Sequence, residues 1–349
     1  MRRAVSEARD GLLRILLPEG PPRLWCPPLT HYGEDGALEA ARIRAHLRHI
    51  SPHVKGLLVP GSTGDGWELT DKEMRQLVKL TLTEAPKLGL RVLVGALKTE
   101  AQQTLEFLRG TLAWLQLRSG DTDRAKLLRS VHVCGFTVCA PRGKDLSQDA
   151  VGRALASFLE TGLPLAIYQL PQVTQNEVGP ELAAALAARF ENFLLFKDSS
   201  GADRVALSGQ SLHGVFTMRG AERDYATWVK AGGGPYEGFL LASANCFAGQ
   251  LCAMLDDLSA GRKDAAHQVS ARLTQVIDAV FRLVAGLSAG NAFANATKAI
   301  DHFCAHGPRA GSVAPPRLHS GIRLPAEVIR GTGEILSRHG LMPGRGYLE

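Results

Sequence analysis

The sequence predicts an α/β protein built as a (β/α)8 TIM barrel with a C-terminal helical extension. Short apolar runs alternate with longer stretches of helical period, and counting gives eight such units, which suits a barrel of about 250 residues. The runs are apolar throughout, as expected of a parallel sheet that is covered on both faces. An open doubly wound sheet is the alternative. That fold, when it binds a dinucleotide, carries a glycine-rich phosphate-binding motif after the first strand and an acidic residue that binds the ribose. The chain has neither.

The strands are predicted from these apolar runs and the helices from the amphipathic stretches between them. The predicted strands lie at 23–26, 54–60, 90–96, 131–140, 163–169, 192–197, 214–219 and 236–242. The clearest helical stretches lie at 37–50, 70–85, 147–160 and 180–190. Thr70 with Glu73 three residues later predicts a capping box, and therefore a defined helix start.

The chain is predicted to contain three segments: a leader at 1–22, the barrel at 23–261 and a helical region at 262–349. The apolar stretch of the leader is short and interrupted by Arg14, which favours a loose leader or an extra helix over a secretion signal. An insertion at about 108–130 makes the third unit long. We expect it to add a helix or a flap before the fourth strand.

The composition is that of a soluble globular chain, with 45% hydrophobic and 21% charged residues. The net charge is +6, but Lys and Arg are scattered and only 6% of residues are aromatic, so we expect no nucleic-acid partner. No apolar run approaches the length of a membrane span. The 6 cysteines form no CxxC pair and show no metal-ligand spacing. We therefore expect a cytoplasmic protein with reduced thiols.

Lys197 ends the sixth predicted strand and is followed by Asp-Ser-Ser-Gly. A lysine at a strand end commonly extends its charge into water, and that is one interpretation. The other is a nucleophile, because the C-terminal ends of barrel strands face the active site. An amine between apolar walls loses hydration of its charged form, so its pKa falls and the free base can attack a ketone to form a Schiff base.

Two further motifs stand at the ends of predicted strands. Tyr168 closes the fifth strand, where its phenol is either a proton shuttle or a core tyrosine with a satisfied hydroxyl. A turn comes directly after the second strand and is either a plain tight turn or a site for a carboxylate, held by backbone N–H groups and two hydroxyls. The turn consists of Gly61, Ser62, Thr63 and Gly64. Together with Lys197, these motifs would complete a mechanism for a 2-oxo acid.

The order and spacing of the motifs resemble the dihydrodipicolinate synthase / N-acetylneuraminate lyase family of class I, pyruvate-type aldolases. The resemblance rests on "CPPLTHYGEDGALE", "GSTGDGWELTDKE", "YQLPQ", "FKDSSG" and "GFLLASAN", and it covers nearly the whole chain. It implies a barrel that is often tetrameric, with Lys197 as the Schiff-base lysine and Tyr168 as the proton-transfer tyrosine. It also implies that Ser62 and Thr63 bind the substrate carboxylate, with no metal or organic cofactor. Gly220 and Asn245 match family positions that shape the pocket.

The departures from the family concern the second substrate. The synthases carry an aromatic pair after the fourth strand, where this chain has Arg142 and Gly143. An arginine located after the tyrosine motif is replaced by Val173, and a Thr-Pro pair by Pro27 and Pro28. These changes argue against lysine-biosynthetic condensation. Arg142 is either a contact for an anionic substrate or a surface arginine.

The sequence therefore predicts a Schiff-base-forming aldolase or lyase acting on pyruvate or a related 2-oxo acid, with an aldehyde as the second small-molecule substrate. A keto-sugar-acid dehydratase or hydratase that uses the same lysine is an alternative. A catalytically silent family member that binds a small oxo acid is another. We expect a homo-oligomer, either a dimer or a tetramer, without membrane or nucleic-acid partners.

Overall fold

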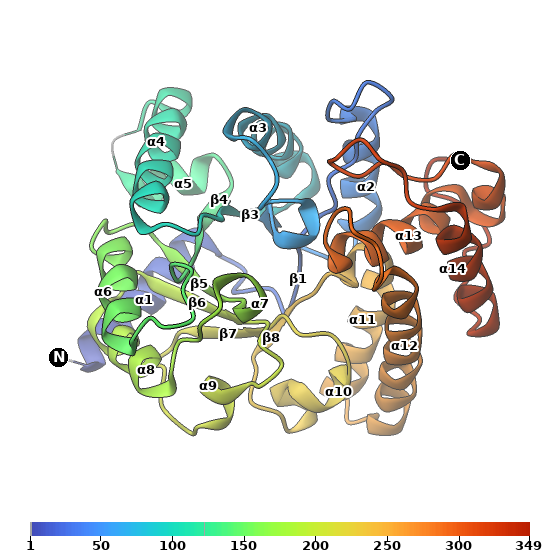
Figure 1. The fold of residues 1–349 in the computed structure, drawn as a ribbon. Helices are drawn as coiled ribbons and strands as arrows, with labels where there is room; N and C mark the ends of the chain where they lie inside the picture. The colour runs from blue at the N-terminus through green and yellow to red at the C-terminus, as the bar shows by residue number, and fades with distance from the viewer. Residues whose placement is uncertain (1, 122) are drawn as a thin grey trace. The chain divides into compact units, whose positions relative to one another are not determined.

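The computed structural model describes residues 2–121 and 123–349. Within them, eight parallel strands close into a barrel in chain order, as Figure 1 traces. The strands are β1 (Leu24–Cys26), β2 (Gly56–Val59), β3 (Arg91–Ala96), β4 (Val133–Cys139), β5 (Leu165–Gln169), β6 (Phe193–Asp198), β7 (Phe216–Arg219) and β8 (Gly238–Leu240). The predicted fold class is confirmed, and the continuous apolar runs explain why each strand is buried on both faces.

The chain divides into two compact units. The first contains the residues up to Arg23 together with 91–221 and 235–240, and it holds β3 to β8. Its helices are α1 (Arg2–Leu16), α4 (Ala101–Ser119), α5 (Arg124–Ser130), α6 (Gln148–Leu159), α7 (Pro171–Thr174), α8 (Pro180–Arg189) and α9 (Arg204–Leu207). The stretch at about 108–130 forms the end of α4 and all of α5, directly before β4.

Helix α1 is fastened to the first unit by Arg9. The Arg9 side chain is 0% exposed, and its guanidinium donates to the backbone carbonyls of Phe193 and Phe190, both at 2.7 Å. It also donates to Ala187 O at 2.5 Å and to His213 O. Burial lowers the pKa of Arg9 to about 10. The predicted leader at 1–22 therefore contains a packed helix, which is held in place by hydrogen bonds from the Arg9 guanidinium to backbone carbonyls.

The second unit contains residues 24–90, 222–234 and 241–349, with β1 and β2. Its helices are α2 (Ala40–Ile50), α3 (Asp71–Leu88), α10 (Tyr225–Trp228), α11 (Ala244–Ser259), α12 (Lys263–Val284), α13 (Ala292–His306) and α14 (Ala326–Arg338), with 3-10 turns η1 (Ser62–Gly64), η2 (Lys230–Gly232) and η3 (Gly307–Ser312). Helix α12 packs against α11, α13 and α14, which lie beside it in Figure 1. The capping box at the start of α3 is confirmed, because Thr70 and Glu73 exchange both hydrogen bonds.

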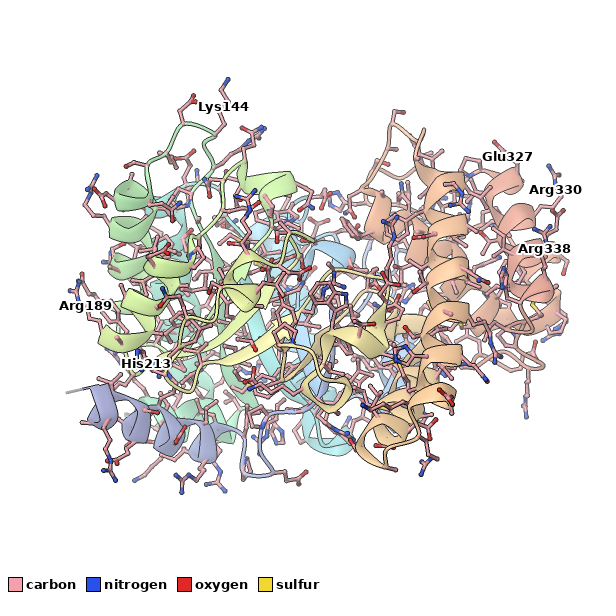
Figure 2. The ribbon with its side chains drawn as sticks, turned by 90° about the horizontal axis from the view of Figure 1, so that it is seen from below. Lys144, Arg189, His213, Glu327, Arg330 and Arg338 are labelled. Atoms are coloured by element: carbon pink, nitrogen blue, oxygen red, sulfur yellow. The ribbon has the colours of Figure 1, made fainter. Side chains whose placement is uncertain are left out.

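Charged residues occupy the outer side of α14. Figure 2 shows Glu327, Arg330 and Arg338 projecting from this helix, while Val328 and Ile329 are buried. The sequence of the helix predicts this amphipathic pattern. Among the described residues, no helix combines the length and the apolar character that crossing a membrane requires.

Candidate active site

Lys197 lies in a row of side chains across four strands of the first unit. Cys139 on β4, Tyr168 on β5, Lys197 on β6 and Met218 on β7 are successive register partners. Because paired residues of adjacent strands point to the same face of a sheet, the four side chains line one face together. Lys197 is only 4% exposed and Tyr168 3%. Lys197 is therefore not a strand-end lysine with its charge in water.

The amine of Lys197 lies over the ring of Tyr168. Its Nζ atom is 3.8 Å from the ring centroid. Burial raises the pKa of the Cys139 thiol to about 12, and the charge of Lys197 acts on that thiol in the opposite direction. The amine thus lies over an aromatic ring and is almost completely buried, in surroundings where a nucleophilic lysine is expected to work.

Gly220 makes room for this lysine. A Cβ atom at Gly220 would lie 2.6 Å from Lys197 Cε and 2.0 Å from Ser199 Oγ. Ser199 is 7% exposed, and its hydroxyl has no hydrogen-bond partner among the described residues. Sequence reasoning passed over Ser199. The spacing could have identified it, because in an extended chain the residue two positions after Lys197 points to the same side as Lys197.

A polar network on the opposite face holds the ends of these strands. Asp198 accepts hydrogen bonds from Ser200 N at 2.8 Å and from the Tyr236 hydroxyl at 3.4 Å, and burial raises its pKa. Arg219 and Asp203 form a buried bidentate ion pair with both N–O distances at 3.0 Å, and Tyr236 donates to Asp203 at 2.7 Å. Bidentate pairs have little freedom of orientation, so this network fixes the backbone on both sides of the lysine.

Arg142 lies in the loop after β4. Its backbone N–H donates to Thr99 O at 2.9 Å, and its side chain is exposed. Figure 2 shows the side chain of Lys144, in the same loop, extending outward. A contact between Arg142 and an anionic substrate stays a prediction.

In the second unit, the predicted carboxylate turn is η1 with its flanking residues. The N–H groups of Gly64 and Gly66 both donate to Gly61 O at 3.0 Å, and Asp65 N donates to Ser62 O at 3.2 Å. We expected several backbone N–H groups of this turn to face a ligand. Of the four predicted residues, Gly64 uses its N–H group inside the turn, as Asp65 and Gly66 do directly after it. Contacts of a ligand with the N–H groups of Gly61, Ser62 and Thr63 stay a prediction.

The hydroxyls of the turn are held firmly in place. Ser62 and Thr63 are 7% and 4% exposed, and Trp67 Nε1 donates to Ser62 Oγ at 2.8 Å. A Cβ atom at Gly64 would lie 2.5 Å from Pro28 O, so only glycine allows this close approach. The backbone of the turn is therefore closely packed and the Ser62 hydroxyl is held by Trp67, a rigidity that a binding site for a small anion requires.

Asn245 stands in the first turn of α11 and is 0% exposed. Its side-chain oxygen accepts from Leu29 N at 2.9 Å, and its amide nitrogen donates to Pro27 O at 3.0 Å and Ala242 O at 2.9 Å. The side chain thus links the segment after β1 to the start of α11. A direct contact between Asn245 and a substrate stays a prediction.

The second unit also contains a group that we call the histidine cluster, made of His31, His46, His302 and His306 with Arg42 and Asp301. The ligand atoms of His31, His46 and Asp301 lie within 4.8 Å of one another, a spacing that a metal ion could use. The imidazoles, however, already share a hydrogen bond of 2.9 Å, and Arg42 donates to Asp301 at 2.8 Å. A bound cation would break these bonds beside a fixed positive charge, so the residues fit a structural network better than a metal site.

Comparison with known proteins agrees with the predicted resemblance. The model of the dihydrodipicolinate synthetase family matches residues 153–289. The 4-hydroxy-tetrahydrodipicolinate synthase of Mycolicibacterium paratuberculosis is 27% identical over 267 residues, which cover 73% of this chain and 78% of the relative. The matched segment 153–289 includes both Tyr168 and Lys197.

Solved structures share the fold. The prophage protein YagE of Escherichia coli, in complex with pyruvate, superposes with a TM-score of 0.71 at 19% identity, covering 91% of this chain and 98% of that one. A variant of the Sulfolobus solfataricus 2-keto-3-deoxygluconate aldolase, also with pyruvate, gives 0.67 at 14% identity, covering 91% and 96%. With the matching family model and the similar synthases, these comparisons show that the chain is similar to the dihydrodipicolinate synthetase family and shares the fold of the solved proteins.

Proposed function

We propose that the protein is a Schiff-base-forming aldolase or lyase that acts on pyruvate or a related 2-oxo acid. The observation that carries the proposal is the buried amine of Lys197, 3.8 Å from the centroid of the Tyr168 ring. Two proteins of the same fold are known in complex with pyruvate, which supports pyruvate as the first ligand to try.

In the proposed reaction, Lys197 Nζ attacks the C2 carbonyl carbon of the 2-oxo acid. Tyr168 passes a proton to the carbinolamine hydroxyl, which leaves as water, and a protonated imine remains. The Tyr168 phenolate then takes the proton of the C4 hydroxyl, the C4–O bond becomes a carbonyl, and the imine accepts the electron pair of the C3–C4 bond, so the aldehyde departs and an enamine is left. Protonation at C3 and hydrolysis then release the shortened 2-oxo acid and restore the amine. Condensation is the same sequence in reverse.

Binding of the substrate is assigned to other residues. We propose that the hydroxyls of Ser62 and Thr63 hold its carboxylate, on the ground of the rigid turn and the family resemblance. The replacement of the aromatic pair by Arg142 and Gly143 supports a second substrate other than that of the lysine-biosynthetic synthases. A homo-oligomer also remains a proposal, which light scattering would test.

Reductive trapping tests the role of the lysine. Pyruvate and then borohydride should add a lactyl-like mass to the peptide that contains Lys197 in the wild-type protein. The Lys197→Arg variant, shown to be folded by circular dichroism, should acquire no adduct there. Failure of the folded wild-type protein to become labelled at Lys197 would remove the proposal.

The alternatives diverge after the imine has formed. A keto-sugar-acid dehydratase or hydratase would also be trapped on Lys197, but its substrate would lose or gain water without releasing pyruvate. A catalytically silent member would be trapped and would turn over no substrate. A panel of 2-oxo acids with aldehydes, and of keto-sugar acids, read by mass spectrometry and pyruvate release, separates the three.

A further inference from the structure

Helix α13, in the C-terminal helical region, contacts the η1 turn at two points. Asn291, the N-cap of this helix, donates from its amide to Ser62 O at 3.1 Å. Lys298 Nζ lies 2.7 Å from Asp65 Oδ2, and Asp65 comes directly after η1. Asn291 and Lys298 are two helical turns apart, so the same side of α13 makes both contacts.

The Lys298–Asp65 ion pair is almost completely buried. The side chain of Lys298 is 1% exposed and that of Asp65 4%. The Tyr32 hydroxyl donates to the same Asp65 oxygen at 3.0 Å, and the Lys298 amine lies 4.8 Å from the centroid of the Tyr32 ring. Buried charges are costly to desolvate, and removal of one partner leaves the other uncompensated. The pair therefore ties the backbone at Asp65 to α13 with little freedom.

The turn depends on this support for two reasons. Asp65 adopts a left-handed conformation with φ of 58°, a sparsely populated region in which aspartate is better tolerated than most residues but which still costs free energy. In addition, Asp65 follows Ser62 and Thr63 by three and two positions and is itself buried, so its negative charge lies in the same turn as the hydroxyls that we assign to the substrate carboxylate. Without a cation beside it, that negative charge would repel the substrate in a medium where charges are poorly screened.

We propose that Lys298 is a positioning residue for substrate binding, which neutralises Asp65 and so allows the Ser62–Thr63 turn to accept a carboxylate. The C-terminal helical region is then part of the binding site, through α13. This inference rests on the proposed function of the turn. A purely structural ion pair is the competing explanation, and it predicts lower stability without a specific change in substrate affinity.

Removal of one charge of the pair at a time separates the two explanations. Lys298→Met leaves Asp65 unpaired and should raise KM for pyruvate at least tenfold, with kcat within threefold of wild type. Asp65→Asn removes the negative charge instead and should leave KM at or below the wild-type value. The double variant should recover most of the affinity that Lys298→Met loses. A purely structural pair would affect KM alike in both single variants, and that result would overturn the proposal, as would an unchanged KM in Lys298→Met.

Arg42→Met is the matched control. Arg42 also makes an ion pair to α13, with Asp301 at 2.8 Å, in which Asp301 is buried and Arg42 is 11% exposed. This pair does not involve the turn. Its removal should lower the melting temperature by an amount similar to Lys298→Met and leave KM unchanged. If Lys298→Met does not fold, the sign of the KM change in Asp65→Asn still decides the proposal.

Hydrogen exchange tests the support of the turn by Lys298 without any substrate, and so separately from the proposed function. Amides of the peptide 58–70 should exchange faster in Lys298→Met than in Arg42→Met or wild type. Trapping of the wild type on Lys197 together with an unchanged KM in Lys298→Met would overturn this inference alone. Absence of trapping in the wild type would remove the proposed function, and exchange rates equal to those of the control would then remove the inference as well.

Discussion

Gly220 determines the space that is available to the side chain of Lys197. A methyl group at this position would meet Lys197 Cε at 2.6 Å and Ser199 Oγ at 2.0 Å. Both atoms lie at the ends of flexible side chains, so they can move aside without disturbing the backbone. A larger residue at position 220 should therefore displace the amine of Lys197 and leave the stability of the fold nearly unchanged.

We predict that Gly220→Ala slows reductive trapping at Lys197 about a hundredfold, because displacing a reacting group by about 1 Å is enough for such a loss. The melting temperature should change little. Gly110→Ala, in helix α4 where a Cβ atom meets no other atom within 4 Å, is the control and should trap at the wild-type rate. Trapping at the wild-type rate in Gly220→Ala would contradict the assigned role.

Individual residues differ in how far the sequence could predict them. Lys197 and Tyr168 were predictable because each ends an apolar strand, and strand ends meet at one end of a barrel. The pairing of Asp65 with Lys298 was not predictable, because the two residues are separated by 233 positions. Lys298 stands in a helix where a lysine is normally exposed, and nothing in its local sequence indicates burial.

At the scale of elements, the strands were the best predicted feature. Each observed strand begins and ends within two residues of its predicted bounds. The reason is physical: a strand covered on both faces is mostly apolar, with polar residues gathered at its end, and turn residues follow. The packing of helix α1 was harder to predict. Arg9 holds this helix through backbone carbonyls, and because every residue has a carbonyl, the sequence does not show which ones accept.

We predict that Arg9→Met lowers the free energy of unfolding by about 2–4 kcal/mol, because several buried carbonyl groups lose their donor. Arg14→Met on the same helix is the control. The Arg14 contact is an exposed hydrogen bond of 3.3 Å to Asp10 O, so we expect a change below about 0.5 kcal/mol. Urea denaturation measures both values, and equal midpoints for the two variants would show that α1 contributes little through Arg9.

At the scale of the whole molecule, the histidine cluster should make stability depend on pH. Burial lowers the pKa of all four of its histidines, to about 4 for His306. Burial alone would raise the pKa of Asp301, but the charges of His46, Arg42 and His31 outweigh it and lower that pKa. The unfolded chain therefore binds more protons than the folded chain as the pH falls below about 6.5.

We predict that the urea midpoint is highest near pH 7 and falls between pH 7 and pH 5, where the histidines titrate in the unfolded chain. Asp301 adds to the loss only below about pH 4, since its unfolded pKa is about 3.9. His306→Gln should make the decline shallower by removing one titrating group. His267→Gln, an exposed position on α12, should leave it unchanged. A midpoint that is equal at pH 7 and pH 5 would contradict this account.

The buried pair of Lys298 and Asp65 also bears on how the protein is made. Asp65 leaves the ribosome 233 residues before Lys298. At about 5–20 residues per second, the interval is on the order of 10–50 s. Lys197 on β6 is synthesised within this interval, before Lys298, so the nascent chain then carries Lys197 while Asp65 still lacks its cation. A chain released early, or cut by a protease before α13, would keep the nucleophile and lose the support of the turn. If the turn binds the substrate as we propose, binding begins only when synthesis is nearly finished.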